Sequence, residues 1–333
     1  MIPVEVASAW GWSIDQIEPL AGGLINATYA VRQGGRPIAV LQRLHPIFGG
    51  AVNLDLDAVT THLAARGMVT PRLIRTLDHR PFLEHDGIWR ATSWVEGTAV
   101  AAVPDPSWAA AGGVLVGSFH RAVADLHYDY RFTRAGVHDT ARHLERLGEL
   151  VHGDDPAGTR LAREILAAAA GLPPLGDQPL RHVHGDLKIS NLLFHTEPLR
   201  GAALVDLDTL ARGTLAFELG DAMRSWCNPH GEDAGRVKFE LPNFAAAIAG
   251  FRAIADPIVT EAERASIAVG LETVCVELAA RFCIDVFEDR YFGWDPQRFA
   301  SRRDHNLIRS QGQLALALDV RSQREAMRDV LLG

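Results

Sequence analysis

Cysteine is scarce in this chain, with only Cys227, Cys275 and Cys283 among 333 residues. No two of them form a C-x-x-C pattern, so the sequence indicates neither a structural zinc site nor a disulfide framework. A sparse, odd set is typical of a reducing compartment. Long apolar runs are also lacking, since none approaches 18 residues, and the first residues carry no basic segment of a signal peptide. We therefore expect a cytoplasmic protein with no membrane partner.

Positive charge is in deficit as well. Lys and Arg number 33 against 41 Asp and Glu, which leaves a formal net charge of −8. Nucleic-acid-binding chains normally carry a basic surplus, so we expect no nucleic-acid partner. The hydrophobic share of 47% is enough for one large core or two medium cores. The composition predicts a globular protein, whose chemistry has to be inferred from its motifs.

One segment carries most of the chemical information: H-G-D-L-K-I-S-N at 184–191, followed by V-D-L-D at 205–208. Asp186 and Asn191 stand five residues apart, and Asp206 ends an apolar run that reads as a strand. The kinase catalytic loop H-R-D-x-x-x-x-N has the same acid-to-amide spacing and is followed by a metal-binding Asp. The order and spacing predict phosphoryl transfer to the hydroxyl of a small molecule.

Phosphoryl transfer depends mainly on neutralised charge and on holding two oxygens in line. Mg²⁺ prefers hard oxygen ligands and keeps several waters, so one amide and one carboxylate suffice, and Asn191 and Asp206 can supply them. Asp186 is then the predicted base for the hydroxyl proton. Lys188 is predicted to reach the transferred phosphoryl group, with a surface lysine as the alternative. Asp221 is predicted to cap or brace the loop without being catalytic itself.

The chain changes character near residue 100. Residues 27–32 and 37–43 are apolar runs around Q-G-G-R, a turn typical of a β-hairpin. From Asp105-Pro106, an N-cap with proline at the first helical position, apolar residues recur at helical spacing. We predict an α+β fold with a small β-rich, nucleotide-binding N-terminal lobe (1–97). The larger, mainly helical C-terminal lobe (98–333) would hold the catalytic loop and the acceptor site.

Glycines before the first hairpin indicate a nucleotide-binding loop. Gly22, Gly23, Asn26 and Thr28 belong to A-G-G-L-I-N-A-T, where backbone N–H groups could approach phosphate oxygens. The segment matches neither G-x-G-x-x-G nor a Walker A motif, so a plain turn is the alternative.

A kinase also needs a cation beside the phosphates, usually on its third strand. Gln42 and Arg43 are adjacent there, and because strand side chains alternate, only one of them faces the nucleotide. Arg43 is the candidate cation, although the sequence leaves the choice open. The backbone around Trp94 and Glu96, in the connector between the lobes, is predicted to meet the adenine edge.

These motifs resemble the aminoglycoside phosphotransferase and choline kinase superfamily, most closely its N-acetylhexosamine 1-kinase branch. The matching segments are L-I-N-A-T-Y at 24–29, V-L-Q-R-L at 40–44, V-H-D-T at 137–140, V-D-L-D-T at 205–209, L-G-D-A-M-R at 219–224 and H-N-L-I-R at 305–309. The resemblance implies a bilobal protein-kinase-like fold and Mg²⁺-dependent transfer of the ATP γ-phosphate. It places Asp186 as the base and Asn191 and Asp206 as metal ligands. The chain departs from the branch at Arg212, where proline is frequent.

Polar residues in apolar helical segments are the candidates for the acceptor site: Arg224, Arg281, Asp285, His305 and Arg309. Arg281 and Asp285 are four residues apart, as are His305 and Arg309, so each pair shares a helix face. A structural ion pair is the alternative for each. Because the region is mixed in sign, it favours an amino sugar or related hexose over a polycationic acceptor.

Two other functions stay open: a kinase of an amino alcohol or aminoglycoside, and a non-catalytic regulator that binds nucleotide. A protein kinase is disfavoured, because Asp206 lacks the glycine of D-F-G and no A-P-E segment follows. The sequence does not determine the acceptor, its hydroxyl, the choice of ATP or GTP, the oligomeric state or the pathway.

Overall fold

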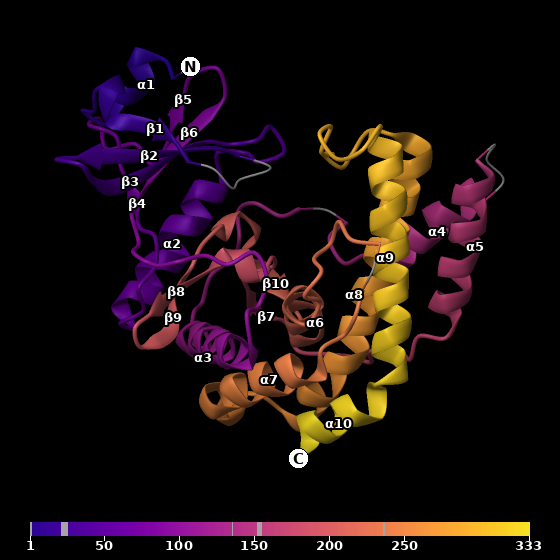
Figure 1. The fold of residues 1–333 in the computed structure, drawn as a ribbon. Helices are drawn as coiled ribbons and strands as arrows, with labels where there is room; N and C mark the ends of the chain where they lie inside the picture. Colours follow the sequence, from indigo (N-terminus) through magenta and orange to yellow (C-terminus); the bar gives the residue numbers. More distant parts are fainter. Residues whose placement is uncertain (1, 21–25, 135, 152–154, 236) are drawn as a thin grey trace.

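Two lobes of different composition make up the molecule, as Figure 1 shows. The structure is a computed structural model of residues 1–333 and describes all of them except 1, 21–25, 135, 152–154 and 236. The N-terminal lobe contains an antiparallel sheet, and the C-terminal lobe contains helices and two short two-stranded sheets. The predicted α+β organisation is confirmed. The boundary after residue 97 falls in the connector between the lobes and stays a prediction.

The N-terminal sheet has the strand order β1-β2-β3-β6-β4, and β5 pairs with β6. Its strands are β1 (Ile17–Pro19), β2 (Ala27–Gln33), β3 (Arg36–Arg43), β4 (Leu73–Ile74), β5 (Leu83–Glu84) and β6 (Ile88–Ser93). The predicted hairpin is confirmed as β2 and β3. Gly34 and Gly35 at its turn have φ values of 57° and 79°, a left-handed conformation that glycine adopts without strain.

The two faces of this sheet have different neighbours. Ala39 and Leu41 of β3 are fully buried in an apolar cluster that includes Trp10. Because side chains alternate along a strand, Gln42 points to the other face, where Arg90 of β6 is its cross-strand partner. One face therefore carries the core of the lobe, and the other carries polar side chains.

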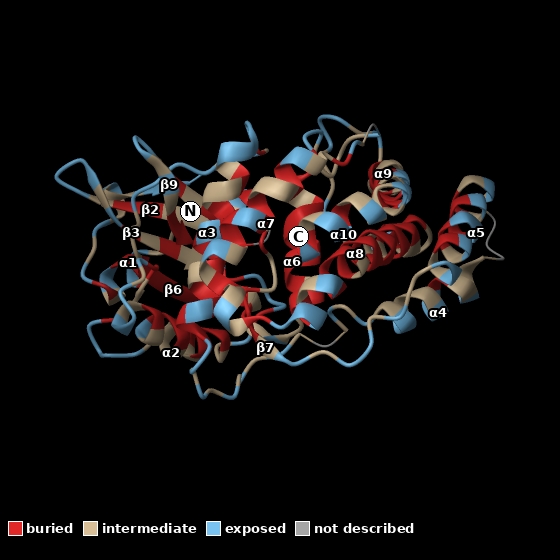
Figure 2. Cartoon of the chain, turned by 90° about the horizontal axis from the view of Figure 1, so that it is seen from below, coloured by how far each residue is buried: buried red, intermediate tan, exposed pale blue. Residues whose placement is uncertain are grey.

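The C-terminal lobe is built around its longest helix. The helices of the chain are α1 (Val4–Ala9), α2 (Val52–Ala65), α3 (Pro106–Ala122), α4 (Thr140–Leu150), α5 (Pro156–Ala170), α6 (Leu215–Trp226), α7 (Leu241–Ala255), α8 (Glu261–Glu288), α9 (Arg302–Ser322) and α10 (Arg324–Leu332). Figure 2 shows α8 buried along most of its length, while α4 carries mainly intermediate and exposed residues. α8 packs against both α6 and α9. The predicted N-cap of α3 is confirmed, since the Asp105 carboxylate accepts a hydrogen bond from the Ser107 N–H at 2.8 Å.

Two strand pairs lie between α5 and α6. β7 (Arg181–Val183) pairs with β10 (Ala211–Gly213), and β8 (Leu192–Thr196) pairs with β9 (Leu199–Leu204). The short 3₁₀ helices η2 (Ile189–Asn191) and η3 (Leu207–Thr209) precede β8 and follow β9. These strands position the predicted catalytic loop and the predicted metal-binding loop. None of the helices in the described ranges is long and apolar enough to cross a membrane.

Candidate active site

Glu218 of α6 holds the backbone of the catalytic loop. It is buried, and its carboxylate accepts hydrogen bonds from the backbone N–H groups of His184 (2.8 Å) and Gly185 (2.9 Å). Gly185 has a φ of 78°, and a side chain there would collide with the Thr209 carbonyl, so the turn requires glycine. Burial by itself would raise the pKa of Glu218, but His120 and the loop N–H groups outweigh it and hold that pKa below its ordinary value.

Capping or bracing of this loop was predicted for Asp221, and that role stays a prediction. Asp221 accepts a hydrogen bond from Arg224 Nε at 2.9 Å, and its negative charge acts on Lys188 of the loop. Glu218, one turn earlier, was missed. Its signal in the sequence is an acidic residue inside the apolar run L-A-F-E-L, where only a paired carboxylate is tolerated.

His184 joins the catalytic loop to the strand end before Asp206. Its ring is fully buried, with Nε2 at 2.9 Å from the Val205 carbonyl and Nδ1 at 3.3 Å from the Asp186 backbone nitrogen. A carbonyl only accepts and a backbone N–H only donates, so Nε2 carries the proton of a neutral imidazole. Both ring nitrogens are therefore engaged in holding the loop.

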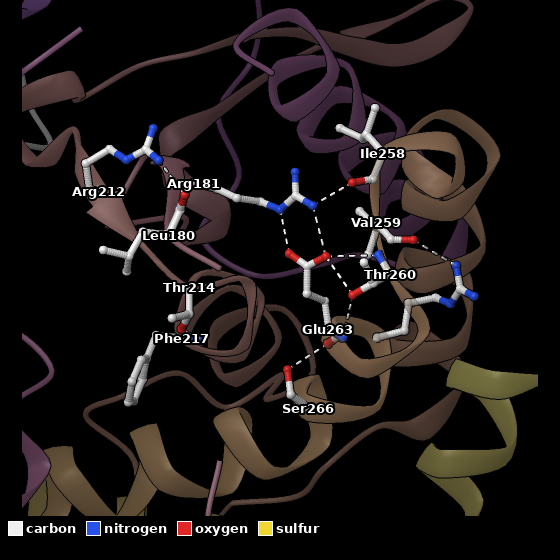
Figure 3. A network of polar contacts seen from close by, with 11 residues as sticks. Leu180, Arg181, Arg212, Thr214, Phe217, Ile258, Val259, Thr260, Glu263 and Ser266 are labelled. Carbon is white, nitrogen blue, oxygen red and sulfur yellow. Dashed lines mark hydrogen bonds and ion pairs between the residues drawn. The ribbon is translucent and has the colours of Figure 1, made fainter. Parts of the chain in front are cut away.

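A second anchor acts where β7 enters the loop. Arg181 donates to the two carboxylate oxygens of Glu263 at 2.5 and 2.9 Å, and to the Ile258 carbonyl at 2.5 Å. Glu263 is buried and also accepts from the Thr260 N–H at 2.9 Å, as part of the capping box of α8. Figure 3 shows how this one carboxylate connects β7 to the start of α8. The strand before the catalytic loop is thus tied to the central helix.

The β8–β9 hairpin brings the two predicted metal ligands together. At its open end, the Val205 N–H donates to the Asn191 carbonyl at 2.9 Å. Asn191 and Asp206 therefore flank the same hairpin end. The Asn191 side-chain nitrogen donates to the Asp186 carbonyl at 2.8 Å, which identifies Oδ1 as the atom turned away from that bond. An amide oxygen and a carboxylate at one strand end are the ligand types that Mg²⁺ prefers.

Asp206 lies in a strongly negative environment. Its backbone is left-handed, with a φ of 62°, and the residue is exposed while Asp208 is buried. Partial loss of bulk water around the carboxylate, then the negative charges of Asp208 and Asp186, raise the pKa of Asp206 to about 6. A divalent cation would offset this excess of negative charge, so these residues fit the predicted metal.

Lys188 lies beside the predicted base. Its Nζ is 3.1 Å from Oδ2 of Asp186, and 45% of its side chain is exposed. Partial burial lowers the pKa of Lys188, but the charges of Asp186, Glu232 and Asp221 outweigh it and raise the pKa. The ammonium group therefore stays charged next to Asp186.

The polar face of the N-terminal sheet is joined to the metal-binding loop. Gln42 Oε1 accepts from Arg90 Nε at 2.9 Å, and Gln42 Nε2 donates to Thr28 Oγ1 at 3.3 Å. The Asn26 side-chain amide donates to Asp208 Oδ2 at 2.7 Å, and Arg90 forms an ion pair with Asp208 Oδ1. Arg90 is 2% exposed, and sequence reasoning did not identify it because nothing local marks an arginine on β6.

The direction of the β3 side chains decides whether Gln42 or Arg43 faces the C-terminal lobe. Gln42, and not Arg43, faces the C-terminal lobe. Arg43 is 43% exposed, and its Nη2 lies 2.8 Å from Oδ2 of Asp86 at the turn between β5 and β6. The prediction of Arg43 as the phosphate-facing cation is therefore not supported by its placement, since alternation along β3 directs it to the opposite face. Gly22 and Gly23 lie outside the described residues.

The connector after β6 carries Trp94 and Glu96. The Trp94 backbone N–H donates to the Ile38 carbonyl at 3.0 Å, and its indole Nε1 is buried without a hydrogen-bond partner among the described residues. Glu96 is exposed. Their contact with adenine stays a prediction.

Arg224 is held by two acidic partners. It is 5% exposed and lies 2.9 Å from Asp221 Oδ1 and 3.0 Å from Glu232 Oε1. Burial lowers the pKa of Arg224, but these two carboxylates outweigh it and raise the pKa above its ordinary value. A contact with an acceptor would have to compete with these ion pairs.

Arg281 and Asp285 contact different partners, although they share a face of α8. Arg281 Nη1 lies 3.9 Å from Glu277 Oε1, and its guanidinium lies over the Tyr291 ring at 5.8 Å. The buried Asp285 carboxylate accepts from the backbone N–H groups of residues 290–292 at 2.9, 2.8 and 2.9 Å and from the Asn306 amide at 2.8 Å. Asp285 therefore caps the segment after α8 through N–H groups and not through the ion pair considered as the alternative. A role in acceptor binding stays a prediction for both residues.

His305 and Arg309 converge on Asp233. His305 Nε2 lies 2.9 Å and Arg309 Nε 2.6 Å from the same carboxylate oxygen, and the His305 ring stacks on Phe299 at 3.8 Å. Burial raises the pKa of Asp233, but Arg309 and His305 outweigh it and lower the pKa. These contacts hold the segment between α6 and α7 against α9. A role in acceptor binding stays a prediction for both residues.

Two surface hollows, of about 420 and 320 Å³, lie outside the candidate active site. One lies between α7 and α10, and the other between α2 and residues 128–131. Neither is lined by Asp186, Asn191 or Asp206, so the assignment of the site rests on the geometry of these residues.

The fold is shared with known kinases. The chain resembles the structure of amicoumacin kinase in complex with AMP-PNP, Ca²⁺ and Ami, with a TM-score of 0.63, 14% identity and coverage of 97% of this chain and 91% of that one. It resembles choline kinase from Cryptosporidium parvum with a TM-score of 0.63, 13% identity and coverage of 99% and 98%. The predicted kinase-like fold is confirmed.

Sequence comparison gives a family. The chain is 27% identical to the homoserine kinase of Granulibacter bethesdensis over 301 residues, which cover 86% of this chain and 84% of the relative. The model of the phosphotransferase enzyme family (APH) matches residues 16–253, a range that includes Asp186, Asn191 and Asp206. The predicted superfamily is confirmed, while its N-acetylhexosamine 1-kinase branch stays a prediction. Because the match spans both lobes and well over half of the sequence, the chain belongs to the phosphotransferase enzyme family.

Proposed function

We propose that this enzyme transfers the γ-phosphate of ATP to a hydroxyl of a small metabolite, with Mg²⁺ as the divalent cation. The observation that carries the proposal is the placement of Asp186, Asn191 and Asp206 around one hairpin end. The amicoumacin kinase of similar fold was solved with AMP-PNP and Ca²⁺, which supports a nucleotide with a divalent cation.

Asp186 acts on the acceptor in this proposal. Its side chain is 18% exposed, so an acceptor hydroxyl can reach it. The hydroxyl oxygen forms a bond to the γ-phosphorus, the bond from phosphorus to the ADP oxygen breaks, and the hydroxyl proton passes to the Asp186 carboxylate. Lys188 places a positive charge beside the transferred group.

Asn191 and Asp206 would hold Mg²⁺. When bound, the metal neutralises charge on the phosphate oxygens as they line up for transfer. The chain contributes the rigidity of the site, because His184 and the β8–β9 hairpin hold both ligands through main-chain contacts.

We propose an amino sugar or related hexose as the first acceptor to test. The side chains near α6 and α8 alternate in sign, with Arg224 between Asp221 and Glu232 and Arg281 beside Glu277. Such a mixture suits a neutral acceptor rich in hydroxyls better than a polycation.

A hydroxylated amine is the second candidate, either an amino alcohol or aminoglycoside or the hydroxy amino acid homoserine. Similarity to a homoserine kinase along 86% of this chain favours it. An acceptor with an ammonium and a carboxylate would also match a surface of mixed sign.

An ATP-consumption screen with Mg²⁺ and mass detection of products tests the proposal. The panel holds hexoses, amino sugars, N-acetylated sugars, homoserine, choline and aminoglycosides. Turnover of a sugar set supports the first acceptor, and turnover confined to homoserine supports the second. Nucleotide binding without turnover of any acceptor, with Asp186→Asn indistinguishable from the natural protein, would favour a non-catalytic regulator.

A further inference from the structure

A buried polar cluster connects the two lobes at the metal-binding loop. We call it the Asp208 cluster, and its members are Asn26, Thr28, Gln42, Arg90 and Asp208. Arg90 donates to Gln42 through Nε at 2.9 Å and Nη2 at 2.8 Å, and through Nη1 it pairs with Asp208. The two partners of the ion pair are 2% and 1% exposed, so no solvent screens their interaction.

Each oxygen of the Asp208 carboxylate, at the centre of the cluster, has a partner. Oδ1 of Asp208 pairs with Arg90, and Oδ2 accepts from the Asn26 amide at 2.7 Å. Asn26 is fixed in turn, since its Oδ1 accepts from the His45 N–H at 2.8 Å. Asp208 therefore binds the N-terminal lobe with both oxygens, at Arg90 on β6 and at Asn26 just before β2.

Asp208 lies two residues after Asp206, whose φ of 62° is costly for a residue other than glycine. Such a conformation persists only where the residues on both sides are fixed. On the N-terminal side, Val205 is held by its bonds to Asn191 and His184. On the C-terminal side, the Asp208 cluster supplies the restraint.

From this geometry we infer that Arg90 is a positioning residue for the metal site and acts through Asp208. Arg90 supplies a positive charge from the N-terminal lobe, as was expected of a residue on β3. It is too deeply buried to contact a phosphate directly. By neutralising Asp208 and fixing it to the sheet, Arg90 holds Asp206 in its ligand conformation and fixes the N-terminal lobe to the metal-binding loop. The inference rests on the proposed Mg²⁺ site at Asn191 and Asp206.

The first measurement needs no nucleotide. Hydrogen exchange is followed in peptides covering 204–212 of the full chain. In Arg90→Met we expect these amides to exchange about tenfold faster or more, because removing one partner leaves a buried charge unpaired. Arg321→Met is the control, since it removes one of the two arginines, on α9 and α10, that pair with the buried Glu272 of α8, and exchange in 204–212 should not change. Unchanged exchange in Arg90→Met would overturn the inference.

The second measurement is the affinity for AMP-PNP by calorimetry, with and without Mg²⁺. We expect Mg²⁺ to raise the affinity of the natural protein for AMP-PNP. Arg90→Met should lose at least about tenfold of that gain, while its metal-free affinity stays within about twofold of the natural value. Arg90→Lys keeps the positive charge but cannot reach both Gln42 and Asp208, so it should lose part of the Mg²⁺-dependent gain in affinity. This milder variant also provides the test if Arg90→Met does not fold. Asp208→Asn should reproduce the loss, and the double variant Arg90→Met with Asp208→Asn should add little to it.

The outcomes separate the inference from the proposed function. A large fall in metal-free affinity in Arg90→Met would mean direct phosphate contact and overturn the positioning role. An intact Mg²⁺ gain in a folded Arg90→Met would overturn it as well. A natural protein that binds AMP-PNP without any gain from Mg²⁺ would overturn the proposed metal site together with the role of Arg90, even if exchange in 204–212 responds as expected.

Discussion

Asp186 and Asp285 illustrate how two aspartates of one lobe serve different purposes at the residue scale. Asp186 has an accessible carboxylate next to the Lys188 ammonium. Asp285 is 2% exposed and accepts four hydrogen bonds, three of them from backbone N–H groups. A carboxylate saturated in this way has little capacity left for an acceptor, whereas Asp186 can receive a proton.

Asp186→Asn should fold and bind nucleotide but lose transfer by a factor of about 10³ or more, because an amide cannot take the hydroxyl proton. The measurements are kcat with the best acceptor and AMP-PNP affinity. Asp78→Asn, at an exposed aspartate paired with Arg80, is the control and should keep its kcat. Near-natural turnover in Asp186→Asn would contradict the assignment of the base.

Asp285→Ala should reduce the free energy of unfolding by about 3 kcal/mol, since it leaves three backbone N–H groups and the buried Asn306 amide without their acceptor. Urea denaturation measures the loss, and KM for the acceptor measured at low temperature should change little in the folded fraction. Natural stability combined with a large rise in KM would restore the predicted role of Asp285 in acceptor binding.

At the scale of elements, α6 is the support of the catalytic loop. Its Glu218 binds two loop N–H groups, and its Arg224 ties α6 to the segment that follows it through Glu232. β7, which enters the loop, is anchored separately to α8 through Arg181 and Glu263. The loop is thus held by helices that come later in the chain, so its shape depends on the completed lobe.

Glu218→Gln should change the pH dependence of stability. The pKa of Glu218 is lower in the folded protein than its ordinary value of 4.5, so its stabilisation is present above pH 4.5 and is lost as the pH falls through the folded pKa. The natural protein should therefore lose free energy of unfolding below about pH 4.5, while Glu218→Gln starts lower at pH 7 and loses less. Urea titrations at pH 7 and pH 4 compare the two. Equal losses would show that Glu218 is not a charged brace.

At the scale of the whole molecule, one set of contacts between the lobes lies at the metal-binding loop. Asn26 and Asp208 are separated by 182 residues and Arg90 and Asp208 by 118, yet both pairs are in direct contact. A ligand that binds the loop and the sheet together would therefore stabilise both lobes.

Mg²⁺ with AMP-PNP should raise the Tm of the natural protein, with a stabilisation of about 2.7 kcal/mol at a ligand concentration 100 times Kd. Asp206→Ala removes the carboxylate ligand, so most of the Mg²⁺-dependent rise in Tm should be lost. The Mg²⁺-dependent rise is the difference between the Tm measured with nucleotide and Mg²⁺ and the Tm measured with nucleotide alone. An unchanged Mg²⁺-dependent shift in Asp206→Ala would contradict the assigned metal ligand.

The sequence by itself determined the parts of this protein that depend on neighbouring residues. The β2–β3 hairpin follows from Gly34 and Gly35, the start of α3 from Asp105 and Pro106, and the order of the proposed base and metal ligands from one loop and one hairpin. Each of these is encoded within a few residues by turn geometry, capping or spacing.

Only the tertiary structure decided which distant side chains meet. It placed Gln42 rather than Arg43 toward the C-terminal lobe, put Arg90 on Asp208, and put Glu218 against the catalytic loop. These contacts join residues separated by tens to more than a hundred positions. Their formation depends on how the sheet packs on the helices, because a buried charge selects the partner that packing brings within reach.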